Sequence, residues 1–180
     1  MKRNLISLLL LWASCSLSAQ ESNGIQSSVD SAHQNITTMS IQEISDRLAL
    51  KNLVDTFSNL ADTKEIDKQV LLFTKDAEVT SYQGEELTSH LKGRQELAER
   101  FKAFLDRFTT VYHINGQQTV QIDGDKATGI AYAQVVLVSE KDGNKTTLME
   151  GVRYNDEYER KDDKWYICKR TSHFEWSKEL

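Results

Sequence analysis

Residues 109–176 decide the fold, and they read TTVYHINGQQTVQIDGDKATGIAYAQVVLVSEKDGNKTTLMEGVRYNDEYERKDDKWYICKRTSHFEW. Runs rich in β-branched and aromatic residues alternate there with clusters of Asp, Gly, Asn and Lys at 123–125, 142–144 and 161–164. Such clusters favour tight turns because these residue types tolerate left-handed backbone. The pattern predicts an antiparallel meander. Its strands, joined by hairpins, span 117–122, 126–140, 145–160 and 165–176.

The residues before the meander predict helices that cover one face of it. Ser40 and Glu43 have the spacing of a capping box, and apolar side chains then recur at helical spacing as far as Ala61. The other predicted elements are a short amphipathic helix at 66–73, a strand at 77–82, a polar loop at 83–92 and a helix at 93–108. Helices gathered on one side of a largely antiparallel sheet define an α+β domain.

The strand over 126–140 predicts a curved sheet. At about 3.3 Å per residue it would be about 50 Å long if straight, so it must bend. Gly129 is the predicted site of a bulge that allows the bend. We therefore expect a cone-shaped α+β domain, in which a strongly curved antiparallel sheet packs on three N-terminal helices and encloses a pocket.

The first 19 residues predict a secretory signal peptide. A basic start precedes a leucine-rich run that is too short for a membrane span, and small and polar residues lead to cleavage after Ala19. Residues 20–39 are polar and predict a flexible lead-in to a domain over 40–177. We expect an exported protein, periplasmic or secreted, and the alternative is a lipoprotein anchored through Cys15.

Charge and motifs exclude several classes of function. Loss of residues 1–19 removes two basic side chains and leaves 20 basic against 27 acidic residues, a formal charge of −7. An acidic chain without a basic stripe does not favour nucleic acid as a partner. The sequence contains no HExxH, CxxC or Gly-rich phosphate-binding motif. We therefore expect no metal site.

Several short phrases occur in an order typical of one superfamily. They are LAD at 60–62, LFTKDA at 72–77, HIN at 113–115, GVRY at 151–154 and DKWYI at 163–167. Over 41–176 the chain resembles the nuclear-transport-factor-like superfamily, within its SnoaL-like and scytalone dehydratase-like branch. The resemblance implies the cone fold and a pocket for a small hydrophobic ligand. It also implies dehydratase, isomerase or cyclase chemistry without a cofactor.

The resemblance assigns roles to particular residues. Asp62 and His113 match an aspartate that ends the first helix and orients a histidine, the acid or base, on the strand after the third helix. Tyr82 matches a tyrosine that hydrogen-bonds the substrate oxygen or a bound water. A second pocket histidine of the family falls near Ala131, where this chain has none and Tyr132 is the nearest replacement. This departure leaves the pocket expected and the dehydratase reaction open.

Tyr132, Tyr154 and Arg170 are the expected ligand-binding residues. A tyrosine supplies an apolar body with a hydroxyl group that can orient a ligand. Arg170 has two readings: it meets an anionic ligand or the Asp62 carboxylate, or it is an exposed charge near the mouth of the cone.

Two functions from different classes fit these residues. The first is a cofactor-independent lyase or isomerase, in which His113 moves a proton, Asp62 orients it and Tyr82 polarises the substrate oxygen. The second is an exported binding or protein-interaction module that uses the same pocket or the open sheet face without chemistry. A homodimer through that face is a further expectation. Candidates for its exposed side chains are Val135, Leu137, Met149 and Val152.

Overall fold

A six-stranded sheet with helices beside it makes up the part of the chain that this computed structural model describes, residues 39–180. Residues 42–180 form one folded unit. The predicted signal peptide (1–19) and all but the last residue of the predicted lead-in (20–39) lie outside the described residues. Within residues 39–180, no helix is long and apolar enough to cross a bilayer.

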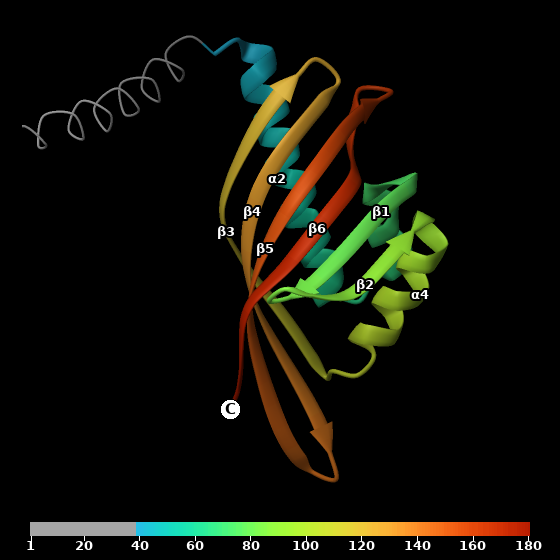
Figure 1. The fold of residues 1–180 in the computed structure, drawn as a ribbon, viewed down its shortest axis with the longest axis vertical. Coiled ribbons are helices and arrows are strands. Elements are labelled where there is room, and N and C mark those ends of the chain that lie inside the picture. The colour runs from blue at the N-terminus through green and yellow to red at the C-terminus, as the bar shows by residue number, and fades with distance from the viewer. Residues whose placement is uncertain (1–38) are drawn as a thin grey trace, which may run out of the picture. The chain divides into compact units, whose positions relative to one another are not determined.

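The predicted meander forms the larger part of the sheet. Its four strands, which Figure 1 shows side by side, are β3 (Thr110–Asp123), β4 (Lys126–Lys141), β5 (Asn144–Lys161) and β6 (Lys164–Glu179). Each pairs antiparallel with the next along the chain. The backbone angle φ is positive in every hairpin, at Gly124, Asp142, Gly143, Asp162 and Asp163. The predicted turn residues therefore occupy the turns, because these types tolerate left-handed backbone.

Two further strands extend the sheet beyond β6. The first is β1 (Phe73–Gln83), which pairs parallel with β6, and β2 (Glu86–Lys92) forms the edge. The sheet order β2-β1-β6-β5-β4-β3 is therefore mixed. The predicted loop at 83–92 is wrong, because residues 86–92 pair with β1 as a strand. No residue of β2 is buried, so the sequence lacks the apolar alternation that marks a half-buried strand.

The helices follow the predicted order with different ends. The long predicted helix is α2 (Ile41–Asp62), whose buried residues recur at helical spacing. The second predicted helix is a single α-helical turn, α3 (Ile66–Gln69), continued by the 3-10 turn η1 (Val70–Leu72). The third is α4 (Gly93–Leu105), which ends before the predicted position 108.

Polar contacts between distant residues fix α2 on the sheet, and Figure 1 shows α2 behind the long strands and α4 beside β2. Arg47 Nη1 donates to the Val120 carbonyl at 2.8 Å. The carboxylate of Asp46 accepts hydrogen bonds from Arg160 at 2.7 Å and from the Trp165 indole at 2.9 Å. These contacts join residues 73 to 119 positions apart, so they define tertiary rather than local structure.

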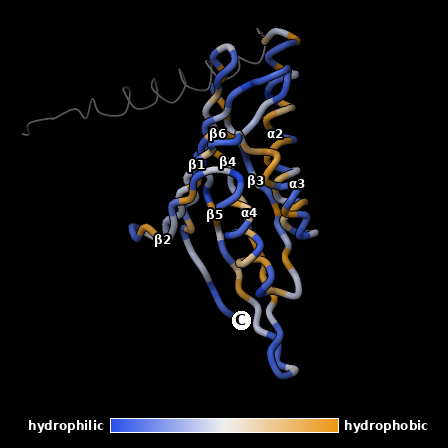
Figure 2. The backbone as a smooth tube through the Cα atoms, turned by 90° about the vertical axis from the view of Figure 1, so that its right-hand side faces the viewer, coloured by the Kyte–Doolittle hydropathy of each residue, from blue (hydrophilic) through white to orange (hydrophobic). Residues whose placement is uncertain are grey.

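The hydrophobic core lies between the helices and the inner face of the sheet. The Phe57 ring is in edge-to-face contact with Phe73, Phe101 and Tyr154, at centroid distances of 5.9, 6.0 and 6.2 Å. Such pairs stabilise a core beyond the area they bury. Figure 2 shows apolar segments in orange along α2 and α4. The predicted α+β cone is confirmed, with a mixed instead of a wholly antiparallel sheet.

Gly129 does not mark a bulge. Pairing of β4 with β5 continues across it, and the irregularity of the β3–β4 pair lies between Asn115 and Gln118. A Cβ atom at Gly129 would lie 2.9 Å from Val120 Cγ1 and 3.1 Å from Tyr158 Cε2. A glycine is needed at this position because these side chains approach the backbone closely. The predicted bulge at Gly129 is wrong, because the strand pairing is regular there.

Three of the four side chains expected on the open face of the sheet lie on its inner face instead. Val135, Leu137 and Val152 are 5, 1 and 2% exposed and belong to the core, and Met149 is only partly exposed. The prediction that Val135, Leu137 and Val152 lie on the open face is therefore wrong, as a one-residue shift exchanges the faces of a strand. Met149 precedes the cavity-lining Glu150, so alternation along β5 places Met149 on the outer face. The large apolar side chains exposed on the strands of the meander are Tyr112, Ile114, Ile130, Tyr132 and Trp176.

Candidate active site

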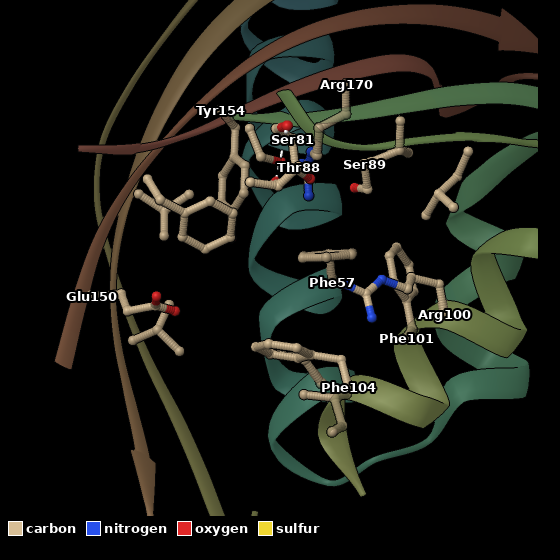
Figure 3. A pocket seen from close by; sticks show the side chains of 18 of the residues that line it. Phe57, Ser81, Thr88, Ser89, Arg100, Phe101, Phe104, Glu150, Tyr154 and Arg170 are labelled. Carbon is tan, nitrogen blue, oxygen red and sulfur yellow. Dashed lines mark hydrogen bonds between the residues drawn. The ribbon is translucent and has the colours of Figure 1, made fainter. Parts of the chain in front are cut away.

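A cavity of about 300 Å³ lies between α2, α4 and the inner face of the sheet. Figure 3 shows Phe57, Phe101 and Phe104 on its helical side, with Glu150 and Tyr154 on its strand side. The titratable and charged side chains that line it are Arg100, His113, Glu150, Tyr154 and Arg170. An apolar enclosure with a few converging polar groups is the usual form of a small-molecule site.

His113 and Asp62 meet at the wall of this cavity. Asp62 ends α2, and His113 lies near the start of β3. The His113 ring atom Nδ1 lies 2.6 Å from Asp62 Oδ1, and the His113 backbone N–H donates to Asp62 Oδ2 at 3.2 Å. The two side chains are 7% and 22% exposed, so hydrogen bonds hold a carboxylate that burial would otherwise penalise. The structure brings together the two residues that the resemblance pairs.

The Asp62 contact determines which nitrogen of His113 is free. An ionised carboxylate only accepts hydrogen bonds, so we assign the proton to Nδ1, which donates to Oδ1. Nε2 then carries a lone pair, on a side chain that lines the cavity. Burial lowers the pKa of His113 below its ordinary 6.5, although Asp62 acts to raise it. The imidazole is therefore neutral at neutral pH, which is the form that accepts a proton.

Arg170 is buried on β6, so its reading as an exposed charge is wrong. Its guanidinium is 1% exposed, and Nε and Nη2 each donate to Asp156 at 2.7 Å. It lies against two rings, 4.4 Å from the Phe57 centroid and 4.2 Å from the Tyr154 centroid. Burial opposes the charge, but the Asp156 carboxylate outweighs burial and raises the pKa of Arg170. Its carboxylate partner is Asp156 and not Asp62.

Two buried side-chain atoms of the described residues lack a hydrogen-bond partner, and both belong to side chains that line the cavity. They are Arg170 Nη1 and Gln69 Oε1. The Gln69 amide is held by its Nε2, which donates to the Phe57 carbonyl at 3.1 Å. An unpaired buried polar group costs about 1–3 kcal/mol. Both atoms are buried, so they lie within the wall of the cavity and not on its surface.

Tyr154, an expected ligand-binding residue, lines the cavity. It pairs across the β4–β5 ladder with Ala131, near which the resemblance expects a second histidine. Burial raises the pKa of Tyr154 to about 12, so its hydroxyl group stays protonated. Tyr154 thus brings a neutral hydroxyl group to the region where the family's second histidine is missing.

Glu150 is a cavity-lining carboxyl group that sequence reasoning missed. It lies on the inner face of β5, is 8% exposed, and in Figure 3 turns its carboxyl group toward the cavity. Burial raises the pKa of Glu150 above its ordinary 4.5, against the weaker opposing influence of Arg107. Alternation along the strand gives the signal that could have found it, because Val152 and Tyr154 follow at intervals of two.

Tyr82 does not reach the cavity. Its neighbours Ser81 and Gln83 line the cavity, so the Tyr82 side chain lies on the opposite face of β1. There its ring stacks on His173, with 5.4 Å between the ring centroids. The predicted contact of Tyr82 with a pocket ligand is therefore wrong.

Tyr132 also lies away from the cavity. It is 40% exposed and lines a second, open groove together with Ile114 and Trp176. Its predicted role as a ligand-binding residue of the main cavity is therefore wrong. Because its neighbours Ala131 and Ala133 are buried, alternation along β4 places Tyr132 outside.

The acidic and sulfur-bearing side chains do not form a metal centre in the described part of the chain. Among residues 39–180, no three His, Cys, Asp or Glu side chains are grouped so that they could hold a metal ion.

Comparisons with known proteins agree with this architecture. A family model for the SnoaL-like domain matches residues 42–171. The uncharacterized protein Rv2910c of Mycobacterium tuberculosis is 28% identical over 135 residues, which cover 73% of this chain and 87% of that protein.

Two solved structures have the same fold at low sequence identity. A candidate scytalone dehydratase from Novosphingobium aromaticivorans has a TM-score of 0.68 at 17% identity, and the match covers 79% of this chain and 92% of that one. The hexachlorocyclohexane dehydrochlorinase LinA-type3 from Novosphingobium barchaimii has a TM-score of 0.63 at 19% identity, covering 76% and 91%. At these identities the likeness shows the fold alone.

Proposed function

The chain belongs to the SnoaL-like domain family, and we propose that it is a cofactor-independent lyase or isomerase of a small, mostly apolar molecule. The observation that carries the proposal is the hydrogen bond of 2.6 Å between Asp62 and His113 at the cavity wall. A buried histidine oriented by a carboxylate is a suitable general base, because one ring nitrogen is fixed and the other is free.

The chemistry begins with proton removal from carbon. Nε2 of His113 takes a proton from a carbon next to a carbonyl group, and Asp62 stabilises the imidazolium that forms. The negative charge moves to the carbonyl oxygen. The Tyr154 hydroxyl group of the cavity wall can donate a hydrogen bond to that oxygen, and the charge of Arg170 lies 4.2 Å from the Tyr154 ring centroid. Donors placed where charge develops are a large source of catalysis in a site shielded from water.

The enolate has two outcomes. Return of the proton to another carbon gives an isomer, whereas departure of a group from the neighbouring carbon gives an elimination. The two structural relatives named above are a candidate dehydratase and a dehydrochlorinase, both of which are named for eliminations. These names favour elimination for this chain as well.

Deuterium exchange tests the proposal without knowledge of the natural substrate. The probe is 4-phenylbutan-2-one in deuterium oxide, and proton NMR follows loss of the signals next to its carbonyl group. We expect exchange to be faster with wild-type protein than in buffer alone. In His113→Gln this catalysed rate should be about 10²–10⁴-fold lower than in wild type. The matched control is His173→Gln, because His173 stacks on Tyr82 outside the cavity. Exchange at the buffer rate, or equal rates for wild type and His113→Gln, would contradict the proposal.

The alternative is an exported ligand-binding or protein-interaction module without chemistry. The cavity, lined by apolar side chains with a few polar groups, suits binding as well as catalysis. Ligand-observed NMR on the same samples separates the two functions. Binding of 4-phenylbutan-2-one by wild type and by His113→Gln, with exchange by neither, would favour the binding module.

Export and self-association are proposals of their own. The sequence of residues 1–19 supports export, and the mass of the mature protein tests it, since cleavage after Ala19 and lipid attachment at Cys15 give different masses.

The apolar side chains on the outer face support a homodimer. Sedimentation of wild type and Tyr132→Ser tests that surface, and we expect the variant to be the more monomeric.

A further inference from the structure

Three residues form a row across the inner face of the sheet. His113 on β3 pairs with Val135 on β4, and Val135 pairs with Glu150 on β5. Neighbouring strands lie about 4.8 Å apart, so the backbones of His113 and Glu150 are separated by roughly 10 Å. All three side chains line the cavity. His113 and Glu150 therefore stand on either side of a space that a small organic molecule can occupy.

The carboxyl group of Glu150 has no structural partner. Among the described residues it makes no hydrogen bond or ion pair, and the charge that acts on it is that of Arg107. Its residue is 8% exposed, and Figure 3 shows the carboxyl group facing the cavity. Protein structures seldom bury a carboxyl group without a partner, so a group of this kind in a cavity indicates a function.

Burial favours the neutral form of Glu150, and the nearby positive charge of Arg107 opposes it. The titratable and charged side chains that face the same cavity are Arg100 of α4, His113 of β3, Tyr154 of β5 and Arg170 of β6. The charge of Arg170 is already paired with Asp156. Arg107 lies against the rings of Phe104 and Phe108. Burial outweighs the Arg107 charge and raises the pKa of Glu150, so the group holds its proton to higher pH than an exposed glutamate.

We propose that Glu150 is the general acid of an elimination, and that it delivers its proton to a leaving hydroxyl group while His113 removes the proton from carbon. The inference rests on the proposed function and narrows it. The substrate class becomes small β-hydroxy carbonyl compounds, and the reaction becomes loss of water.

The step balances without any further reactant. His113 Nε2 takes the proton next to the carbonyl group, and the electrons of that C–H bond form the new C=C bond. The C–O bond at the neighbouring carbon breaks, and its electron pair leaves with the oxygen, which takes the Glu150 proton and departs as water. Glu150 is then a carboxylate and His113 an imidazolium. Proton transfer from His113 to Glu150 through water restores the starting state.

The leaving group determines whether the elimination needs a general acid. Hydroxide is strongly basic and leaves poorly unless it is protonated, whereas chloride and acetate leave as stable anions. An acid on the wall facing the base therefore serves a hydroxyl substrate and is not needed for a halide. Glu150 also supplies a second proton-transfer group in a chain that lacks the family's second histidine.

Two probes with different leaving groups test the inference. They are 4-hydroxy-4-phenylbutan-2-one and 4-acetoxy-4-phenylbutan-2-one, which give the same enone, measured by its ultraviolet absorption. Glu150→Gln keeps the shape of the side chain but has no transferable proton. We expect it to lose about 10²–10⁴-fold with the hydroxy probe and less than about tenfold with the acetoxy probe. The control is Glu157→Gln, an exposed residue of the same strand that pairs with Lys169.

Deuterium exchange on 4-phenylbutan-2-one separates this inference from the function on which it rests. Exchange retained by Glu150→Gln, together with selective loss of water elimination, supports the inference. Two kinds of result would overturn the inference but leave the proposed function standing. In the first, wild type exchanges deuterium but eliminates only acetate. In the second, Glu150→Gln loses both eliminations equally, loses neither of them, or loses deuterium exchange. A wild-type protein that neither exchanges nor eliminates overturns both the function and the inference.

Discussion

Burial and Asp62 act in opposite directions on the pKa of His113, the residue on which the proposed chemistry depends. Burial lowers the pKa of His113 and Asp62 raises it, so Asp62→Asn should lower the pKa further. The acid limb of the exchange rate should then move to lower pH than in wild type, while the maximal rate falls because the base is weaker. A pH–rate profile with 4-phenylbutan-2-one measures both effects. An acid limb that stays in place, or moves to higher pH, would contradict the account.

The same residue predicts how stability depends on pH. The pKa of His113 is lower in the folded protein than its ordinary 6.5, so the unfolded chain binds more protons as the pH falls. The stability from a neutral His113 is therefore complete above about pH 6.5 and is lost as the pH falls through the folded pKa. In urea denaturation at pH values from 7 to 5, the free energy of unfolding should fall more steeply for wild type than for His113→Gln. Parallel curves would mean that His113 titrates alike in both states.

Single residues also show what sequence reasoning can and cannot reach. Asp62 and His113 were identified by a resemblance in motif order, and their contact joins residues 51 positions apart, which spacing alone does not reveal. Tyr82 was misplaced by one residue. Its strand alternates from the buried Ala77 and Val79, so the pattern itself places residue 81 inward. Glu150 was missed because a charged residue in a strand is normally exposed.

At the scale of elements, a buried ion pair joins β5 to β6. Asp156 and Arg170 are opposite each other in the ladder, and their side chains are 0% and 1% exposed. Removal of one partner from a buried ion pair leaves an uncompensated charge, so Asp156→Asn should lower the free energy of unfolding by about 3–5 kcal/mol. Denaturant unfolding measures the change.

The next pair along this ladder provides a matched control. Glu157 and Lys169 are opposite each other, with side chains 55% and 50% exposed. Water screens such a pair, so Glu157→Gln should cost less than about 1 kcal/mol. Equal costs for Asp156→Asn and Glu157→Gln would show that burial does not distinguish the two pairs.

Elements differ in how well their sequence predicts them. The hairpins of the meander were predictable because Asp142 and Asp162 occupy positions with positive φ, a local requirement. The edge strand β2 was not, because none of its residues is buried and its sequence therefore resembles a loop. The extension of β1 back to Phe73 depends on pairing with β6, which is a long-range contact.

At the scale of the whole molecule, the site requires both halves of the chain. Asp62 comes from the helical half, whereas His113, Glu150 and Arg170 come from three different strands of the meander. The family resemblance predicted this assembly of helices and sheet, and with it the pocket. It did not predict the buried ion pair of Arg170 or the row that ends at Glu150, because both depend on side-chain direction in this particular sequence.

The protonation state of His113 tests the central claim most directly, and it requires no substrate. Nitrogen-15 NMR of imidazole-labelled protein, assigned with His113→Gln, reports which ring nitrogen carries a proton. We predict a neutral ring at pH 7, with a proton on Nδ1 held by Asp62 and a bare Nε2. An imidazolium at pH 7, or a neutral ring with its proton on Nε2, would contradict the claim that His113 is a base facing the cavity.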